Sequence, residues 1–231
     1  DEMLGANLPD AVADFNQAGI TSVSEILAVP GFDLGRPWIY AELEAADALD
    51  LRVHYYMPAF ALEDLAFIEE VRGLYDGSRL RFAGVKLWVD GSTGSGEAWS
   101  LEPAAGDPEH YGSRYFSTAD LEAFVDAAEE GGYGLKFHVN GDAAVRAVLD
   151  AVETVRDGRG AISQSHLLEH VALFEPSDLS RLAGLGLCAS VQPALALVGP
   201  FSDQAELWEG ERMDRAWDYQ GLLGAGVPLA L

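Results

Sequence analysis

The alternation of apolar, strand-like runs with helix-like stretches most constrains what this chain can fold into. Seven runs rich in aliphatic and β-branched residues are each separated from the next by a stretch with helical features. Because a parallel return between neighbouring strands needs a crossover, which a helix supplies, this order predicts a parallel sheet. The expected strands are Ile20–Glu25, Arg52–Met57, Ala83–Asp90, Gly134–Asn140, Leu167–Val171, Leu187–Gln192 and Val227–Leu231.

Seven consecutive βα units predict an α/β fold: an incomplete (β/α)8 TIM barrel with about seven strands present. A doubly wound sheet would carry a G-x-G-x-x-G turn into a helix, whereas the glycine-rich run Gly91–Gly96 leads into an irregular stretch. The chain starts at Asp1 and stops at Leu231 inside an apolar run. We therefore expect one catalytic barrel domain over residues 1–231, truncated at both ends.

Local signals place several helices. Ser117 followed by Asp120 predicts a capping box at the start of a helix that ends at Gly131-Gly132. Further helices are expected over Asp142–Arg156, with Asp142 as its N-cap, and over Glu211–Ala225. Two connections are longer than usual, Gly91–Phe116 and Pro193–Gly210, and both follow the carboxyl ends of strands, where barrel active sites form.

Charge and composition exclude several classes of protein. The formal net charge is −24, with 14 basic against 38 acidic residues, so the surface repels nucleic acid. No apolar run approaches the ~20 residues that span a bilayer, and no leader opens the chain, so we expect no membrane association. The single cysteine, Cys188, is compatible with the cytoplasm. The acidic excess also predicts stability that rises with salt.

Lys86 is the first candidate site residue, because it is one of only two lysines and lies in an otherwise apolar strand. One interpretation is a lysine that reaches the strand end to meet solvent. The functional alternatives need an amine. These are a Schiff-base lysine, or a lysine carboxylated by CO2 whose anionic oxygens bind metal.

His138 and His170 each lie at the carboxyl end of an expected strand. Together with Lys86 they come from three strands, at the end where barrel active sites form. Imidazole nitrogens beside an anionic oxygen suit zinc and related transition metals. We interpret His54 as a core or barrel-facing residue and His166 as lying at the opposite strand end.

At these residues the chain resembles the amidohydrolase superfamily, and within it the amidohydrolase-3-type, N-substituted formamide deformylase-like proteins. The matching pieces occur in the family's order over nearly the whole chain. They are Gly19–Val23, Val85–Ser92, His138–Asp142, Leu168–His170, Ser190–Pro193 and Gly226–Leu231.

The resemblance implies a metal site in which Lys86, His138 and His170 are ligands, with zinc as the expected divalent metal and Lys86 carboxylated. Asp90 and Asp142 are further candidates, either to orient a metal ligand such as His138 or to contact the substrate. The family's His-x-His on the first strand does not occur in this sequence. The family's aspartate on the eighth strand would follow Leu231. We therefore expect the segment by itself to be inactive and assign no catalytic residue within it.

The expected function is hydrolysis of amide or other C–N bonds by a metal-dependent amidohydrolase. The alternatives are a Schiff-base aldolase that uses Lys86 covalently, and a non-catalytic barrel that serves as a binding module. The expected partner is a small-molecule substrate, and a homo-oligomer remains open.

Overall fold

The computed structural model describes residues 2–26, 36–198, 208 and 210–231. The chain divides into two compact units, residues 1–86 and 87–231, which are described separately. Among the described residues, no helix is both long enough and apolar enough to cross a membrane.

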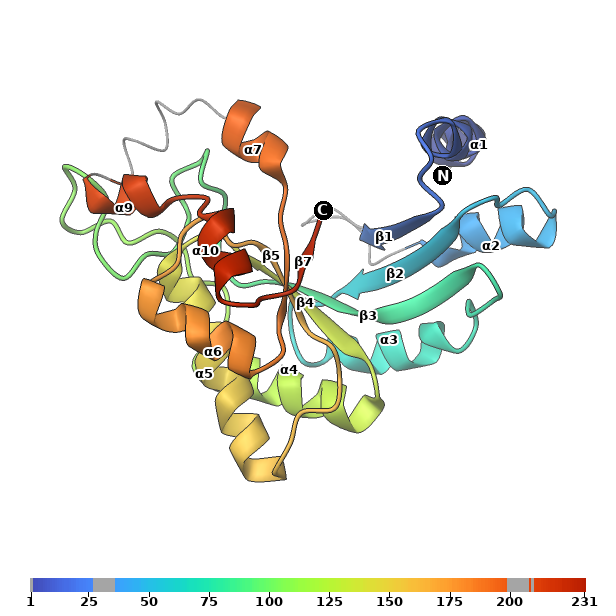
Figure 1. The fold of residues 1–231 in the computed structure, drawn as a ribbon. Coiled ribbons are helices and arrows are strands. Elements are labelled where there is room, and N and C mark those ends of the chain that lie inside the picture. The colour runs from blue at the N-terminus through green and yellow to red at the C-terminus, as the bar shows by residue number, and fades with distance from the viewer. Residues whose placement is uncertain (1, 27–35, 199–207, 209) are drawn as a thin grey trace. The chain divides into compact units, whose positions relative to one another are not determined.

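The first unit alternates helices and parallel strands in the order the sequence predicts (Figure 1). Strand β1 pairs with β2, and β2 pairs with β3, all in parallel. The last two residues of β3 fall in the second unit. The elements are α1 (Glu2–Gln17), β1 (Ser22–Ile26), α2 (Pro37–Ala45), β2 (Arg52–Pro58), α3 (Asp64–Arg72) and β3 (Leu80–Trp88).

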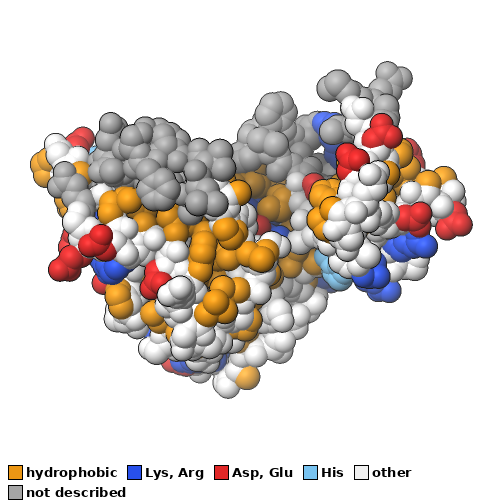
Figure 2. Space-filling model, turned by 45° about the horizontal axis from the view of Figure 1, so that its top comes forward, with side chains coloured by type: hydrophobic (Ala, Val, Ile, Leu, Met, Phe, Trp, Pro, Cys, Tyr) orange, Lys and Arg blue, Asp and Glu red, His pale blue; other side chains and the backbone are white. Residues whose placement is uncertain are grey.

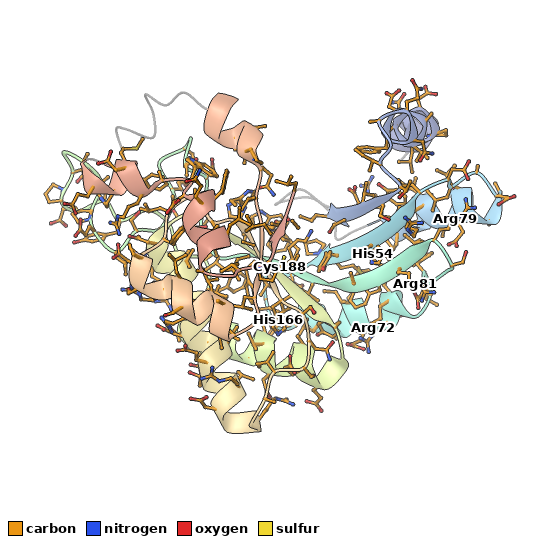
Figure 3. The ribbon with its side chains drawn as sticks, in the orientation of Figure 1. His54, Arg72, Arg79, Arg81, His166 and Cys188 are labelled. Atoms are coloured by element: carbon orange, nitrogen blue, oxygen red, sulfur yellow. The ribbon has the colours of Figure 1, made fainter. Side chains whose placement is uncertain are left out.

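The two faces of this three-stranded sheet differ in character. Val53 and Tyr55 of β2 are fully buried on one face. There the Tyr55 ring packs edge-on against Phe82, and Arg72 of α3 lies over the Phe82 ring, 5.7 Å from its centroid. The opposite face carries His54 and its cross-strand neighbour Arg81, both exposed and both labelled in Figure 3. The core interpretation of His54 is therefore wrong within this unit, whereas the barrel-facing alternative stays a prediction.

The second unit contains the parallel strands β4, β5, β6 and β7, paired in chain order. The two long helices of this unit, α4 and α5, begin and end close to the expected residues. The elements are α4 (Thr118–Gly131), β4 (Gly134–Val139), α5 (Asp142–Arg159), β5 (Leu167–His170), η1 (Pro176–Asp178), α6 (Leu179–Gly184), β6 (Cys188–Ser190), α7 (Pro193–Val198), α9 (Glu211–Arg215), α10 (Tyr219–Gly224) and β7 (Leu229–Ala230).

The capping box at α4 is confirmed. Ser117 Oγ accepts a hydrogen bond from Asp120 N at 3.1 Å, and Asp120 Oδ2 accepts one from Ser117 N at 2.9 Å. The helix ends at Gly132 with φ +71°, a left-handed conformation that glycine adopts without steric cost. These two local signals fix the bounds of α4.

The expected helix over Glu211–Ala225 is wrong, because the structure has two short helices there. Ala216 is extended and Trp217 has φ +59°. Trp217 N donates to Ala172 O at 2.7 Å, and its side chain joins a buried cluster with Leu173 and Trp208. Burial of the indole outweighs continuation of the helix. A second finding is α7, which lies inside the long connection expected over Pro193–Gly210, of which residues 199–207 and 209 lie outside the described residues.

Acidic side chains are scattered over the face shown in Figure 2 rather than gathered into one patch. Some acidic side chains have a basic partner: the guanidinium of Arg181 on α6 binds Asp150 and Glu153 of α5 and Asp178 of η1. Hydrogen bonds to these carboxylates raise the pKa of Arg181 above its ordinary value. This local pairing offsets part of the repulsion expected from the net charge of −24.

Candidate metal centre

Two neighbouring parallel strands of the second unit bring His138 and His170 together. His138 is in β4 and His170 is the last residue of β5, where it pairs in register with Val139. The ring centroids are 4.5 Å apart, with the rings tilted by 72°. His138 Nδ1 and His170 Nε2 face each other at 3.0 Å. The predicted meeting of these two side chains is thus realised in the structure.

The backbone at the end of β5 is bent to make this contact. His170 has φ +73° and Val171 has φ +48°. Positive φ is rare for residues other than glycine, and for a β-branched residue it is an outlier that costs on the order of 1–3 kcal/mol. Val171 is fully buried and its N–H bonds Val139 O at 3.0 Å, which holds the bend. Strain of this kind is typical of functional sites.

A one-way chain of hydrogen bonds runs through the two imidazoles. Asn140 Nδ2 donates to Gly91 O at 2.9 Å, which fixes its amide, and lies 2.8 Å from His138 Nε2. His138 Nε2 therefore accepts, and the proton on Nδ1 points to His170 Nε2. His170 Nδ1 donates in turn to Gln192 Oε1 at 2.6 Å.

The buried carboxylate of Asp90 ties the end of β4 to the long loop that follows β3. It accepts hydrogen bonds from Asn140 N at 3.0 Å and Gly141 N at 2.8 Å, and from Trp99 N at 3.0 Å. Its Oδ1 also lies 4.0 Å from His138 Nε2. Asp90 thus supports the backbone beside His138, and direct contact with a substrate remains a prediction.

Asp142 does not cap α5 as expected. The N-cap is Gly141, and Asp142 is the first helical residue, with its Oδ1 accepting from Leu101 N at 2.8 Å. Burial raises the pKa of the Asp142 carboxyl. Asp142 therefore fixes the 91–116 loop on the start of α5. Its other predicted role, to orient a metal ligand such as His138 or to contact the substrate, stays a prediction.

Lys86 ends the first unit on β3, and its side chain is 1% exposed. In the register, Lys86 is paired with Pro58, whereas Phe82 is paired with Tyr55. The register shifts between Tyr55 and Tyr56, where β3 has one extra residue that interrupts its own alternation. Side chains alternate along β2, so Tyr55 and Pro58 lie on opposite faces, and Lys86 therefore lies on the face opposite the one that α3 covers. That orientation meets one requirement of the metal interpretation. Its convergence on the two histidines stays a prediction.

His166 serves the local structure of the second unit. His166 precedes β5, is 1% exposed, and accepts from Leu135 N through Nδ1 at 3.0 Å. Its Nε2 lies 3.3 Å from Glu129, and burial lowers the pKa of the imidazole. Figure 3 shows His166 and the half-buried Cys188 in the second unit. The prediction that His166 lies at the opposite strand end is confirmed.

The spacing of the facing nitrogens of His138 and His170 fits a metal ion, which would take the place of the proton on His138 Nδ1. Two imidazole nitrogens bound to one tetrahedral zinc ion at ~2.0–2.1 Å lie about 3.3 Å apart, close to the observed 3.0 Å. The outer nitrogen of His170 already has an acceptor, as metal-binding histidines require. Within the described ranges, no group of three or more His, Cys, Asp or Glu side chains could hold a metal ion.

Sequence reasoning missed the two amides, Gln192 and Asn140, as parts of this site. Both lie in the motif pieces that carry the family resemblance, at the carboxyl ends of expected strands. That position was the available signal. Their hydrogen-bond roles depend on the backbone carbonyls that anchor the two amides, Gly91 O for Asn140 and Ser190 O for Gln192.

The family model described as "Amidohydrolase family" matches residues 2–231. The chain therefore belongs to the amidohydrolase family.

Three comparisons illustrate the likeness. The chain is 27% identical over 193 residues to Protein LONG AFTER FAR-RED 3 of Arabidopsis thaliana, covering 84% of this chain and 33% of that protein. It is 24% identical over 225 residues to the N-substituted formamide deformylase of Arthrobacter pascens, covering 94% and 40%. It superposes on an uncharacterised metal-dependent hydrolase of Pyrococcus horikoshii with a TM-score of 0.81 and 24% identity, covering 99% and 44%.

The superposition confirms the predicted fold class, an incomplete (β/α)8 barrel of seven parallel strands with alternating helices. The chain spans between a third and two fifths of the length of the two curated relatives.

Proposed function

We propose that this chain carries part of the active site of a metal-dependent hydrolase that cleaves amide or other C–N bonds in a small-molecule substrate. The observation that carries the proposal is the facing pair of nitrogens, His138 Nδ1 and His170 Nε2, 3.0 Å apart at the carboxyl ends of adjacent parallel strands. Membership of the amidohydrolase family supports the reaction class.

His138 and His170 would hold the metal, with zinc the best match to imidazole ligands. When bound, a divalent metal polarises a carbonyl group and lowers the pKa of water toward ~7. Lys86 is the proposed third ligand, in carboxylated form. Arginine cannot form such an adduct, which agrees with the retention of lysine at this position in a chain with two lysines.

The chain's own residues position this chemistry. The Asp90 carboxylate holds the backbone of Asn140 and Gly141 directly after His138. The same carboxylate holds Trp99, so the 91–116 loop stays fixed beside the histidines. A loop fixed in this way supplies one wall against which a substrate is oriented.

The test uses the full-length protein that contains this chain. We expect it to purify with bound zinc, to release formate or a carboxylate from N-formyl amines or other amides, and to lose activity with a chelator. His138→Ala and His170→Ala should lose both the metal and the activity. His54→Ala is the matched control, because His54 is exposed on β2.

Two outcomes would overturn the proposal. One is a protein in which His138→Ala leaves the metal content and the hydrolysis unchanged. The other is trapping of a substrate adduct on Lys86 by borohydride in a protein without metal, which would establish the Schiff-base alternative.

A further inference from the structure

The amide of Gln192 is anchored independently of the histidines. Gln192 follows β6, and its Nε2 donates to the backbone carbonyl of Ser190 at 3.1 Å. Since a carbonyl oxygen only accepts, this bond fixes which end of the amide is nitrogen. The Oε1 atom is therefore the end that meets His170.

We propose that Gln192 is a positioning residue that selects the tautomer in which His170 presents an unprotonated Nε2 to a metal ion. This inference rests on the proposed function. The Oε1 of Gln192 lies 2.6 Å from His170 Nδ1, so it binds the tautomer that carries the proton on Nδ1. The lone pair of Nε2 then points at His138, where the metal would lie.

Because the backbone at His170 is strained, its ring needs a hydrogen-bond partner that fixes its orientation. His170 has φ +73° and is the last residue of β5, so its ring direction is not set by a regular strand. At the other end of the chain, the Asn140 amide donates to His138 Nε2 and orients that ring, and a metal ion would displace the proton that this bond leaves on Nδ1. The His170 end is held by Gln192. Loss of a partner that orients a metal-binding histidine weakens metal affinity by about 10- to 100-fold.

Two substitutions isolate the acceptor. Gln192→Met and Gln192→Glu have similar size, and both lose the donor to Ser190 O, but only Glu keeps an oxygen facing His170 Nδ1. The full-length protein is first stripped of metal. The Nδ1 proton of His170 is then observed by NMR, and the affinity for Zn²⁺ is measured against a competing chelator.

We expect wild type and Gln192→Glu to show a downfield, slowly exchanging His170 Nδ1 proton that Gln192→Met lacks. Zinc affinity should fall about 10-fold or more in Gln192→Met and stay within a few-fold of wild type in Gln192→Glu. Gln164→Met is the control for a general effect, since the Gln164 side chain bonds only Ser163 among the described residues.

Equal zinc affinity of wild type and Gln192→Met, with the Nδ1 proton signal retained in the variant, would overturn the inference. If Gln192→Met folds poorly, Gln192→Ala is measured in the same way. Wild type that binds no zinc would instead count against the proposed function, so the two failures are distinguishable.

Discussion

Gly141 is the position at which a single added methyl group should perturb the site most. Its backbone conformation, φ −92° and ψ 158°, is open to any residue, so alanine meets no conformational penalty there. A Cβ at this position would, however, overlap the carbonyl group of Trp99 and lie 2.9 Å from Trp99 N. The obstacle is backbone, which cannot rotate away.

The expected cost follows from the contacts that Trp99 must give up if it moves. Trp99 N donates to Asp90 at 3.0 Å, and Trp99 O accepts from Ala143 N at 3.2 Å. Overpacking of this kind costs about 1–3 kcal/mol. For a chain of this size, each kcal/mol lowers Tm by about 2–4 °C. Gly141→Ala should therefore lower Tm by about 2–12 °C.

Gly158→Ala is the matched control. Gly141 caps the start of α5 and Gly158 lies inside the same helix, where an added Cβ would have nothing within 4 Å. Alanine in a helix is favoured over glycine by up to ~1 kcal/mol, so this variant should be neutral or more stable. Thermal unfolding of both variants is followed by circular dichroism. If the two variants melt at the same temperature, the close approach of Gly141 to Trp99 is not a constraint, and the argument is refuted.

Three further predictions address charge and burial. Asp90→Ala leaves three backbone N–H groups without their acceptor. The free energy of unfolding, measured with urea, should therefore fall by about 3 kcal/mol or more, and an unchanged urea midpoint would contradict this. Burial lowers the pKa of His166 below its ordinary 6.5, so the unfolded chain takes up a proton that the folded chain refuses, and Tm should fall as pH drops below about 6.5. His166→Asn should flatten that slope, and an unchanged slope would assign the acid sensitivity elsewhere. Finally, Tm should rise between low and molar NaCl, because salt screens the net charge of −24; a flat or falling Tm would refute the role of self-repulsion.

The order of strands and helices could be predicted because it depends on local signals. Apolar runs set the strands, and Ser117 with Gly132 set the ends of α4. The break at Trp217 could not be predicted, since it depends on packing against Leu173, which is distant in sequence, and against Trp208, which precedes α9.

The site was predictable in part for the same reason. His138 and His170 could be paired because parallel strands bring their carboxyl ends to one edge. The roles of Asn140 and Gln192 could not be predicted, because each depends on where an amide is anchored by a backbone carbonyl. The N-cap assignment of Asp142 failed because its carboxylate binds Leu101 in the long loop instead.

The central claim is that His138, His170 and Lys86 share a metal ion. A crystal structure of the full-length protein, with an anomalous difference map measured at the zinc edge, tests it most directly. The account predicts a peak ~2.0–2.2 Å from His138 Nδ1, His170 Nε2 and an oxygen of carboxylated Lys86. A zinc-loaded crystal with no peak between the two imidazoles, or with Lys86 remote from the peak, would contradict it.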